Sequence, residues 1–456
     1  MRPWRLVGVV GVAALFIPAF STGAPPVSKL SPAERGEKSL LGRHFNPPVI
    51  PLEAYENAWR FWGHGVKAKP ANYAEAFAEH YGLHLAPYPN GGYPMGLRPA
   101  KALFGKALAT DCMLCHGGSI LGKSYVGLPN SRLDYQALYE DLARAAGQDP
   151  ELPFRFTNVR GTTEAGAFAV FLLSWRDPDL TVRTEPLDLD LHDDMCEDTP
   201  AWWLLKKKKT MYHTGGGDAR SVRSLMQFML TPANGRRVIE REEATFRDIQ
   251  AYLLSMQPPR YPLPVDDKLA AKGKQLFTAT CSRCHGTYGE KWTYPNRVVP
   301  LETIGTDRKR YDGLSEKLAK HYNKSWFAQE KKGWLANEYQ GIFTGGYQAP
   351  PLDGIWASAP YFHNGSAPTV YHVLNSKERP KIYTRSFRTD ADAYDSVKLG
   401  WKVKVLDRGA DPKLPPIEQR KVYDTTQPGR GNGGHTFGDH LKHEERMAVI
   451  EYLKTL

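Results

Sequence analysis

The sequence predicts a mainly α protein that contains two helical domains with loop-rich insertions, preceded by an N-terminal extension. The chain has 456 residues, 41% of them hydrophobic, which is enough for two or three domains with their own cores. Few stretches alternate apolar and polar residues with the period of two that strands show, so we expect strands to be minor. The same short motif stands once in each half of the chain, which suggests two similar units.

The composition excludes several classes of protein. With 24% charged and 11% aromatic residues, the chain cannot be wholly disordered, collagen-like or a disulfide-stapled miniprotein. The 60 Lys and Arg residues outnumber the 49 Asp and Glu residues, which gives a formal net charge of +11. This excess would attract anionic partners. No fold signature of a nucleic-acid-binding protein accompanies it, so we expect no nucleic acid partner.

The first residues predict an export signal at 1–24. Arg2 and Arg5 precede an apolar run from Leu6 to Phe20, and small residues ending at Ala24 follow, which is the order of a secretory signal peptide. The alternative is an uncleaved membrane anchor, but the run is shorter than the ~20 residues of a membrane span. We therefore expect a periplasmic or secreted protein with no membrane span after signal removal.

The rest of the chain divides at changes of composition. Residues 25–100 mix aromatic residues, Pro and Gly, and we expect an N-terminal extension packed on the body. Residues 101–257 are predicted to form the first helical domain. The Pro-rich segment 258–264 is stiff and typical of a linker. Residues 265–456 are predicted to form the second domain.

Three helices are predicted from apolar periodicity in these segments. Ala74–His80 is a helical patch within the extension, and Lys268–Thr278 begins the second domain. Lys442–Leu456 ends the second domain, with Met447, Ile450 and Leu453 on one apolar face. A further apolar stretch, Ala165–Leu173, is expected to be a buried helix or strand.

Two copies of the pattern Cys-x-x-Cys-His decide the class of protein. They consist of Cys112, Cys115 and His116 in the first domain and of Cys281, Cys284 and His285 in the second. Two thiols separated by two residues can form thioethers with the vinyl groups of one haem, and the adjacent His then binds the iron. A zinc site would need four converging ligands, and a redox dithiol does not need the trailing His. We therefore expect two cytochrome-c-like haem domains with two covalently bound c-type haems.

The sixth ligand of the second iron is predicted to be His435. Only one methionine, Met447, follows His285, and its place on an apolar helix face favours core packing. The histidines available are His321, His363, His372, His435, His440 and His443. Of these, His435 stands in a Gly-rich run, 429–438, whose glycines allow close backbone approach. His440 and His443 are expected to be solvated.

The first iron is predicted to be open or bound by water. No His or Met occurs between His116 and Leu191, so the nearby sequence offers no strong sixth ligand. More distant candidates are His192, Met195, Met211, His213, Met226 and Met229. An open iron can bind peroxide or dioxygen, whereas a closed one mostly transfers electrons.

Several other residues allow two interpretations. Trp202 and Trp203 are either a core aromatic pair or an electron relay between the haems. The run Lys206–Lys209 is either a solvated face or a site that attracts an acidic redox partner or neutralises haem propionates. Cys196 is interpreted as a buried small hydrophobic residue, with a reactive thiol as the alternative.

The second domain resembles the di-haem cytochrome c peroxidase superfamily. The segments Gly305–Asp307 and Pro351–Thr369 carry this resemblance, and Asn364, Gly365 and Ser366 together with the later His435 are closest to its rubber-oxygenase branch. The resemblance covers most of residues 101–456. It implies two cytochrome-c-like domains, a reactive N-terminal haem, His116 and His285 as proximal ligands, and His435 as a distal ligand.

The sequence departs from the peroxidases at two points. It lacks the gating His that usually follows their first haem motif. Their acidic residue for peroxide cleavage falls near Gln227 in a loose alignment, and an amide cannot transfer the proton that this step needs. Gln227, Trp202 and Trp203 are the candidate catalytic residues.

Two functions follow from the sequence. The first is an exported oxidoreductase that activates peroxide or dioxygen at the N-terminal haem, with the C-terminal haem as the electron-transfer centre. Its partners would be a small redox protein or another electron donor, and peroxide, dioxygen or an organic substrate. The alternative is a non-catalytic di-haem electron-transfer protein.

Overall fold

The computed structural model describes residues 29–63, 65–102, 105–330 and 339–456. The predicted export signal at 1–24 lies outside the described residues. The α-helices up to the linker are α1 Pro32–Gly42, α2 Leu52–Asn57, α3 Tyr73–Tyr81, α4 Met113–His116, α5 Tyr135–Ala145, α6 Ala165–Ser174, α7 Val222–Leu225 and α8 Arg236–Ser255. Those after it are α9 Asp267–Thr280, α10 Ser282–His285, α11 Leu301–Ile304, α12 Lys309–Asp312, α13 Glu316–Lys324, α14 Val370–Leu374, α15 Pro416–Gln419 and α16 His443–Leu453.

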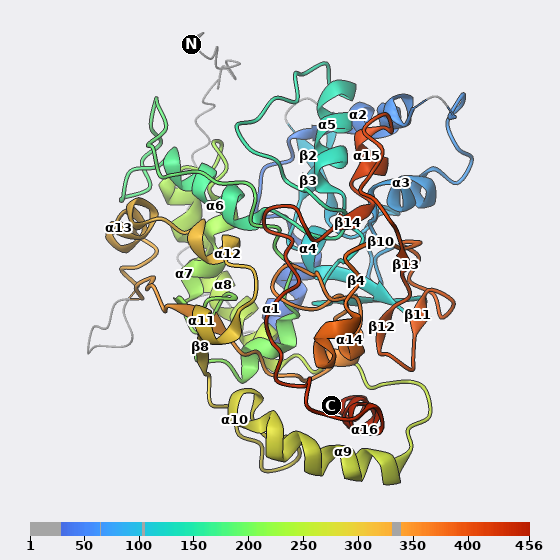
Figure 1. Cartoon of the computed structure of the whole chain (residues 1–456). Coiled ribbons are helices and arrows are strands. Elements are labelled where there is room, and N and C mark those ends of the chain that lie inside the picture. The colour runs from blue at the N-terminus through green and yellow to red at the C-terminus, as the bar shows by residue number, and fades with distance from the viewer. Residues whose placement is uncertain (1–28, 64, 103–104, 331–338) are drawn as a thin grey trace.

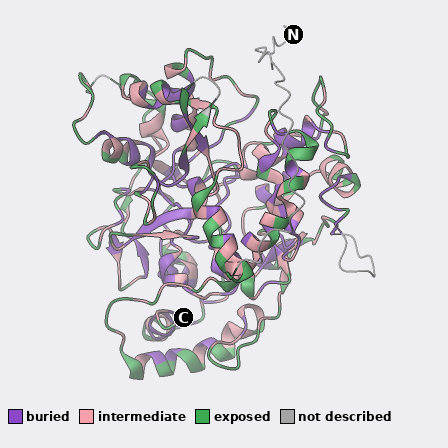
Figure 2. Cartoon of the chain, turned by 180° about the vertical axis from the view of Figure 1, so that it is seen from behind, coloured by how far each residue is buried: buried purple, intermediate pink, exposed green. Residues whose placement is uncertain are grey.

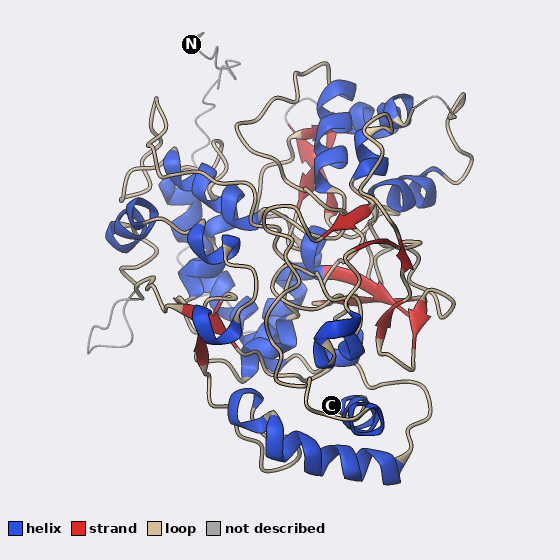
Figure 3. Cartoon of the chain, viewed as in Figure 1, coloured by secondary structure: helices blue, strands red, loops and turns tan. Residues whose placement is uncertain are grey.

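Short strands and 3₁₀ helices lie between these α-helices (Figure 3). The 3₁₀ helices are η1 Ala58–Phe61, η2 Trp202–Lys206, η3 Gln227–Met229, η4 Ile355–Ala357 and η5 Ser376–Glu378. The strands are β1 Ile50–Pro51, β2 Leu97–Ala102, β3 Gly105–Thr110, β4 Gly117–Ile120, β5 Lys123–Val126, β6 Thr210–Met211, β7 Gly217–Asp218, β8 Val298–Pro300, β9 Gly346–Gln348, β10 Ile382–Thr384, β11 Tyr394–Asp395, β12 Gly400–Trp401, β13 Lys404–Val405 and β14 Val422–Asp424.

The strands form small antiparallel sheets of two or three strands each. The structure is 36% helical with 13% strand, so it is mixed rather than mainly α as the sequence predicted. The prediction underestimated the strands because most of them are two to four residues long. A segment of that length is too short for an alternating pattern to stand out.

The N-terminal extension is built into the first unit. Helix α1 lies against α8 so closely that a Cβ atom at Gly36 would stand 2.0 Å from the carbonyl oxygen of Asp248 (Figure 1). Arg35 forms a bidentate ion pair with Asp248, with both nitrogen–oxygen distances at 2.7 Å. The predicted boundary at residue 100 falls inside β2, which pairs with β3 just before the first motif. The extension therefore helps to position Cys112.

The first and last α-helices of the second unit, α9 and α16, pack together at the bottom of Figure 1. The predicted helices Lys268–Thr278 and Ala74–His80 are confirmed as α9 and α3, and Ala165–Leu173 is the helix α6. Helix α9 buries one side and presents exposed residues on its outer side (Figure 2). The predicted helix at the end of the chain is confirmed as α16, and Ile450 and Leu453 of its predicted face are buried, but burial extends to every residue from Ala448 to Leu453.

The two units share a core and a buried ion pair. One hydrophobic cluster joins Leu128 and Trp203 of the first unit to Phe277 and Trp356 of the second. Glu197 pairs with Arg310 in a place where both side chains are 7% exposed. The linker contributes as well, because the carbonyl oxygen of Pro259 accepts a hydrogen bond from the Trp356 indole at 2.9 Å. Among the described residues, no helix has the length and apolar character needed to span a bilayer.

Candidate functional site

The second Cys-x-x-Cys-His motif presents a complete donor set for a covalently attached haem. Its residues span Cys281 and the short helix α10, so both free thiols and the histidine lie on one turn. The Nδ1–H group of His285 donates to the carbonyl oxygen of Pro350 at 2.8 Å. Burial lowers the pKa of His285, which favours the neutral ring. The Nε2 atom therefore keeps the free lone pair that binds a metal.

His435 faces His285 at the distance that one shared metal would require. The ring centres are 6.3 Å apart, and the ring planes are inclined by 58°. Two imidazole nitrogens, each about 2 Å from a metal between them, place the ring centres roughly 6 Å apart. His435 is enclosed by protein, which lowers its pKa to about 4, and its Nδ1 atom is buried without a hydrogen-bond partner. The pair fits the two axial ligands of one haem iron.

The Gly-rich run holds His435 in place by close backbone contacts. A Cβ atom at Gly434 would stand 2.3 Å from the carbonyl oxygen of Ile304, and the backbone N–H of His435 donates to that same oxygen at 2.7 Å. The Asn364 amide donates to the carbonyl oxygens of Gly429 and Gly431 at 3.0 and 2.9 Å. The sequence motifs around residues 305 and 364 therefore meet at the loop that carries His435.

Arg379 also fastens this loop, and the sequence analysis did not single it out. Its guanidinium group donates to the carbonyl oxygens of Asn432 and Gly434, both at 2.7 Å, and to that of His435 at 3.2 Å. The contacts are made to main-chain atoms, so no side-chain pattern in the sequence could have revealed them.

The other candidate ligands in this unit have different surroundings. His440 is exposed, as predicted, and the exposed His443 lies 3.3 Å from the Tyr371 hydroxyl group. His372 is buried and lies 2.7 Å from the Thr369 hydroxyl group. Met447 packs against the core cluster that joins the two units. His363 is buried, stacks on Tyr347 at 4.1 Å and faces His213 at 6.2 Å.

The first motif carries a similar donor set. Cys112 and Cys115 are free thiols that flank the start of α4, and α4 ends at His116. The Asn130 amide donates to the carbonyl oxygen of Leu114 at 3.0 Å, which secures the turn. Burial lowers the pKa of His116 to about 4, and its Nδ1 atom is buried with no hydrogen-bond partner. An orphaned neutral imidazole beside two free thiols fits a haem here too.

The ring that contacts His116 is Trp202 and not a second histidine. Their ring centres are 4.7 Å apart and nearly parallel, with an interplanar angle of 25°. Within the described ranges, no ring contact joins His116 to another imidazole. The two motifs therefore differ in their surroundings, because His285 is faced by His435 and His116 is flanked by an indole.

The distant candidates for a sixth ligand at the first motif have other contacts. Met226 and Met229 lie in the core cluster that also includes α8, and Met195 packs among Phe154 and Phe156. Met211 is buried and His192 is exposed. The His213 ring donates through Nε2–H to the carbonyl oxygen of Asp198 at 2.7 Å.

Trp202 and Trp203 connect the two motifs. Trp202 stacks on His116, and the next indole, Trp203, donates to the carbonyl oxygen of Asp353 at 2.8 Å. The neighbouring backbone N–H of Leu352 donates at 2.7 Å to the Tyr288 hydroxyl group, which donates to the carbonyl oxygen of His285 at 2.9 Å. We call this path from His116 to His285 the tryptophan bridge. Tyr288 was missed in the sequence because a lone Tyr in a loop carries no pattern.

Gln227 lies in a polar group with Tyr212. Its amide donates to the Tyr212 hydroxyl group and to the carbonyl oxygen of Ser224, both at 3.1 Å. Tyr212 has a positive φ of 65°, an uncommon conformation for a bulky residue. Its ring is 40% exposed, although partial burial raises the pKa of its hydroxyl group. Sequence reasoning missed Tyr212, since its backbone strain is visible only in the fold.

The structure shows which residues of the lysine run are exposed and how deeply Cys196 is buried. The solvated-face interpretation is wrong for Lys207, which pairs with Asp353 at 2.8 Å, and for Lys208, which is buried with a pKa lowered to about 8 by burial. Lys206 and Lys209 are exposed. Cys196 is 1% exposed, and burial raises its pKa to about 12, which fits the interpretation as a packed hydrophobic residue.

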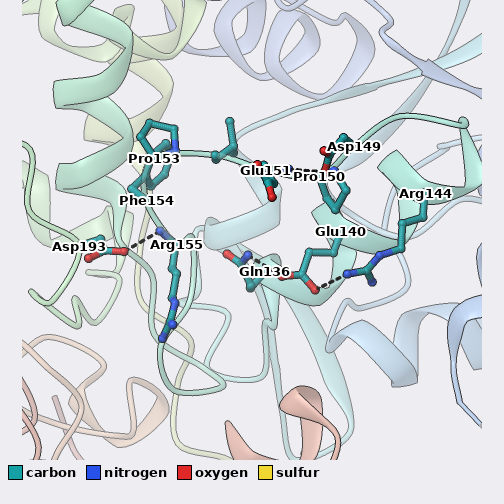
Figure 4. A pocket seen from close by; sticks show the side chains of 11 residues that line it. Gln136, Glu140, Arg144, Asp149, Pro150, Glu151, Pro153, Phe154, Arg155 and Asp193 are labelled. Atoms are coloured by element: carbon teal, nitrogen blue, oxygen red, sulfur yellow. Dashed lines mark hydrogen bonds and ion pairs between the residues drawn. The ribbon is translucent and has the colours of Figure 1, made fainter. Parts of the chain in front are cut away.

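A surface hollow of about 580 Å³ has no residue of either motif in its lining, and Figure 4 shows the residues that line it. Its wall is mostly charged, with Glu140 paired to Arg144 at 3.3 Å and the Asp193 carboxylate accepting from the backbone N–H of Arg155 at 2.8 Å. Because these groups satisfy one another, the hollow is not part of the candidate site.

Comparison with known proteins places a cytochrome c domain in the second unit. Residues 270–355 match the cytochrome c family, and residues 346–384 match a family described as RoxA-like, cytochrome c-like. The first match contains the second Cys-x-x-Cys-His motif. The chain therefore contains a cytochrome c domain with RoxA-like features, which implies a covalently bound c-type haem and a haem-based redox function.

Two curated proteins of Sinorhizobium fredii (strain NBRC 101917 / NGR234) are similar to parts of the chain. Uncharacterized protein y4iJ is 29% identical over 44% of this chain and 41% of its own length. Uncharacterized protein y4iM is 29% identical over 45% of this chain and 52% of its own length. The chain thus spans about half the length of these relatives, and their names state no activity.

Proposed function

We propose that this protein is an exported di-haem c-type cytochrome oxidoreductase of the di-haem peroxidase superfamily, closest to its rubber-oxygenase branch. In this proposal the haem on His116 reacts with peroxide or dioxygen, and the haem on His285 transfers electrons. One observation carries the proposal: His285 is faced by His435 at 6.3 Å, whereas the ring contact of His116 is the Trp202 indole.

A c-type haem supplies one-electron redox chemistry and, where its sixth position is free, a site for small oxidants. The residues around each motif determine whether its haem would only transfer electrons or would also bind a small oxidant. His435 would close the second site to external ligands, because its ring occupies the opposite face. The hydrogen bond from His285 to Pro350 fixes the ring orientation and keeps Nε2 directed away from the backbone.

The tryptophan bridge supports electron transfer between the motifs. Trp202 and Trp203 are adjacent in sequence, and together they extend from the His116 ring to the backbone of Asp353. Trp202 is held by stacking on His116 and Trp203 by core packing and a hydrogen bond, so the relay would need no rearrangement. In this role the two indole rings would lie between the haem on His116 and the haem on His285, and electrons would pass through their π-systems.

The proton chemistry at the first motif is expected to be weak. The Gln227 amide donates to Tyr212 and Ser224, and an amide does not ionise near neutral pH, so in this proposal Gln227 supplies no general acid. Cleavage of peroxide with this residue in place should therefore be slow. This favours an oxygenase-like or slow peroxidase-like reaction within the proposed function.

The location and partners belong to the same proposal. A secretory pattern at 1–24 and a covalent haem are both typical of a periplasmic or secreted cytochrome. The substrate is proposed to be peroxide, dioxygen or an organic molecule oxidised with it. Electrons would come from a small redox protein or another donor.

A non-catalytic electron-transfer protein is the second candidate. It is favoured by Met226, which lies in the same core cluster against which Cys112 packs. A thioether from that cluster would close the first iron, and both centres would then only exchange electrons.

Turnover with peroxide tests the proposed function. The reduced protein should be reoxidised slowly by peroxide, and Gln227→Glu should raise the rate about tenfold, since a carboxyl group can transfer the proton that the amide cannot. The measurement is stopped-flow absorbance of the haem bands over a range of peroxide concentrations. Gln275→Glu, an exposed position on α9, is the matched control and should change nothing. Equal rates for Gln227→Glu and the unmodified protein would remove Gln227 from the site.

A further inference from the structure

A pocket of about 370 Å³ lies where the two units meet the linker. Trp203 and Lys206 come from the first unit, Pro258 comes from the linker, and Lys274 and Trp292 come from the second unit. Sites for small organic ligands commonly measure roughly 300–1,000 Å³ and occur at junctions between domains. The size and the position of the pocket therefore suit a small organic molecule.

The charged side chains of this junction pocket that lack an ion-pair partner are lysines. Lys207 is already paired with Asp353 at 2.8 Å, so these two residues offset each other. Lys206 and Lys274 are exposed, and in the described part of the chain neither ammonium group forms an ion pair. Two lysine side chains without ion pairs in the lining of one pocket favour an anionic ligand.

Four aromatic residues contribute to the walls of the junction pocket, namely Trp203, Tyr288, Trp292 and Tyr452. Trp292 is 43% exposed, although its indole is large and apolar. The Lys207 ammonium group lies 4.9 Å from the Trp292 ring centre and 4.4 Å from that of Tyr288, so one cation holds both rings in place. Exposed rings that are held rigidly are surfaces for stacking a flat ligand.

The junction pocket also touches the tryptophan bridge. Trp203 lines the pocket and belongs to the bridge, next to the indole that stacks on His116. Tyr288 lines it as well, and its hydroxyl group donates to the carbonyl oxygen of His285. A ring bound in the pocket would therefore contact side chains that lead to both haem motifs.

We propose that the junction pocket binds a small aromatic anion that serves as the electron donor, namely a hydroquinone that carries a carboxylate or sulfonate group. The anionic group lies between Lys206 and Lys274, and the ring stacks against the indole of Trp292. Oxidation of the hydroquinone to the quinone releases two protons to water and two electrons, one for each of the two proposed haem irons. The donor role rests on the proposed function, whereas the binding of an aromatic anion does not.

Calorimetric titration of the holoprotein with 2-naphthalenesulfonate tests the binding step. The probe carries a flat aromatic ring and an anionic group, and we expect a single site that requires both. Methanesulfonate, which lacks the ring, and 2-naphthol, which lacks the sulfonate, should each bind at least about tenfold more weakly. The double variant Lys206→Gln/Lys274→Gln should bind the probe about tenfold more weakly, and Trp292→Leu should weaken it by a similar factor. Lys272→Gln, an exposed lysine on the same helix as Lys274 that does not line the pocket, is the matched control.

Reduction of the haems by 1,2-naphthohydroquinone-4-sulfonate tests the donor role. At subsaturating donor, the double variant should be reduced about tenfold more slowly than the unmodified protein. Reduction by dithionite should be equal in both, since it needs no pocket. Absence of 2-naphthalenesulfonate binding, or equal binding in the lysine variants, would overturn the site. Weakened binding with an unchanged rate of reduction would overturn the donor role. A six-coordinate first iron would contradict the proposed function and would leave the binding result untouched.

Discussion

Removing both thiols of one motif is expected to remove one covalently attached haem and leave the other in place. The variants are Cys112→Ala/Cys115→Ala and Cys281→Ala/Cys284→Ala, and each abolishes the thioethers of a single site. A pyridine haemochrome assay should give two haems per chain for the unmodified protein and one for either variant. Haem that remains in the protein after acid–acetone extraction is the measure of covalent attachment.

The control for this experiment is Cys196→Ala. That thiol is buried away from both motifs and should leave the haem count at two. Peptide mapping of the unmodified protein gives the same information without any variant, because the peptides that contain His116 and His285 should each carry the mass of one haem. A single haem per chain, or haem extracted by acid–acetone, would contradict the assignment of two c-type centres.

Replacing His435 with alanine is expected to change one iron from low spin to high spin. His435 is the imidazole that faces His285, and its removal leaves that iron with one strong axial ligand. The optical spectrum of the ferric protein should gain a high-spin charge-transfer band, and its EPR spectrum should lose one low-spin signal. His440→Ala is the matched control, because His440 is exposed and lies in the same loop region. An unchanged spectrum in His435→Ala would redirect the assignment to His363 or Met447.

The parts of the fold that could be predicted from the sequence are those with long periodic patterns. Helices α3 and α9 begin and end within two residues of the predicted ranges, because each has a regular apolar face. Ile450 and Leu453 on the predicted apolar face of α16 are buried, but the prediction missed the other buried residues, since α16 is covered by neighbours on more than one side and period alone does not report that. The strands escaped prediction because tertiary pairing of very short segments, rather than local preference, forms them.

At the candidate site, the sequence pattern was informative where close packing requires a particular residue type. His435 was identified from its glycines, and the structure explains them, since a side chain at position 434 would collide with the backbone of Ile304. By contrast, the contact of Trp202 with His116 and the burial of Lys208 depend on how distant segments pack. The spacing of residues along the chain carries no information on such contacts.

The difference between the two motifs is the central claim, and cyanide binding to the oxidised protein tests it most directly. We expect one high-spin and one low-spin ferric centre in the EPR spectrum of the isolated protein. Cyanide should bind rapidly to the high-spin centre alone, because a vacant or water-bound position need not lose a protein ligand first. Two low-spin centres that both resist cyanide would contradict an open iron on His116 and would favour a non-catalytic electron-transfer function.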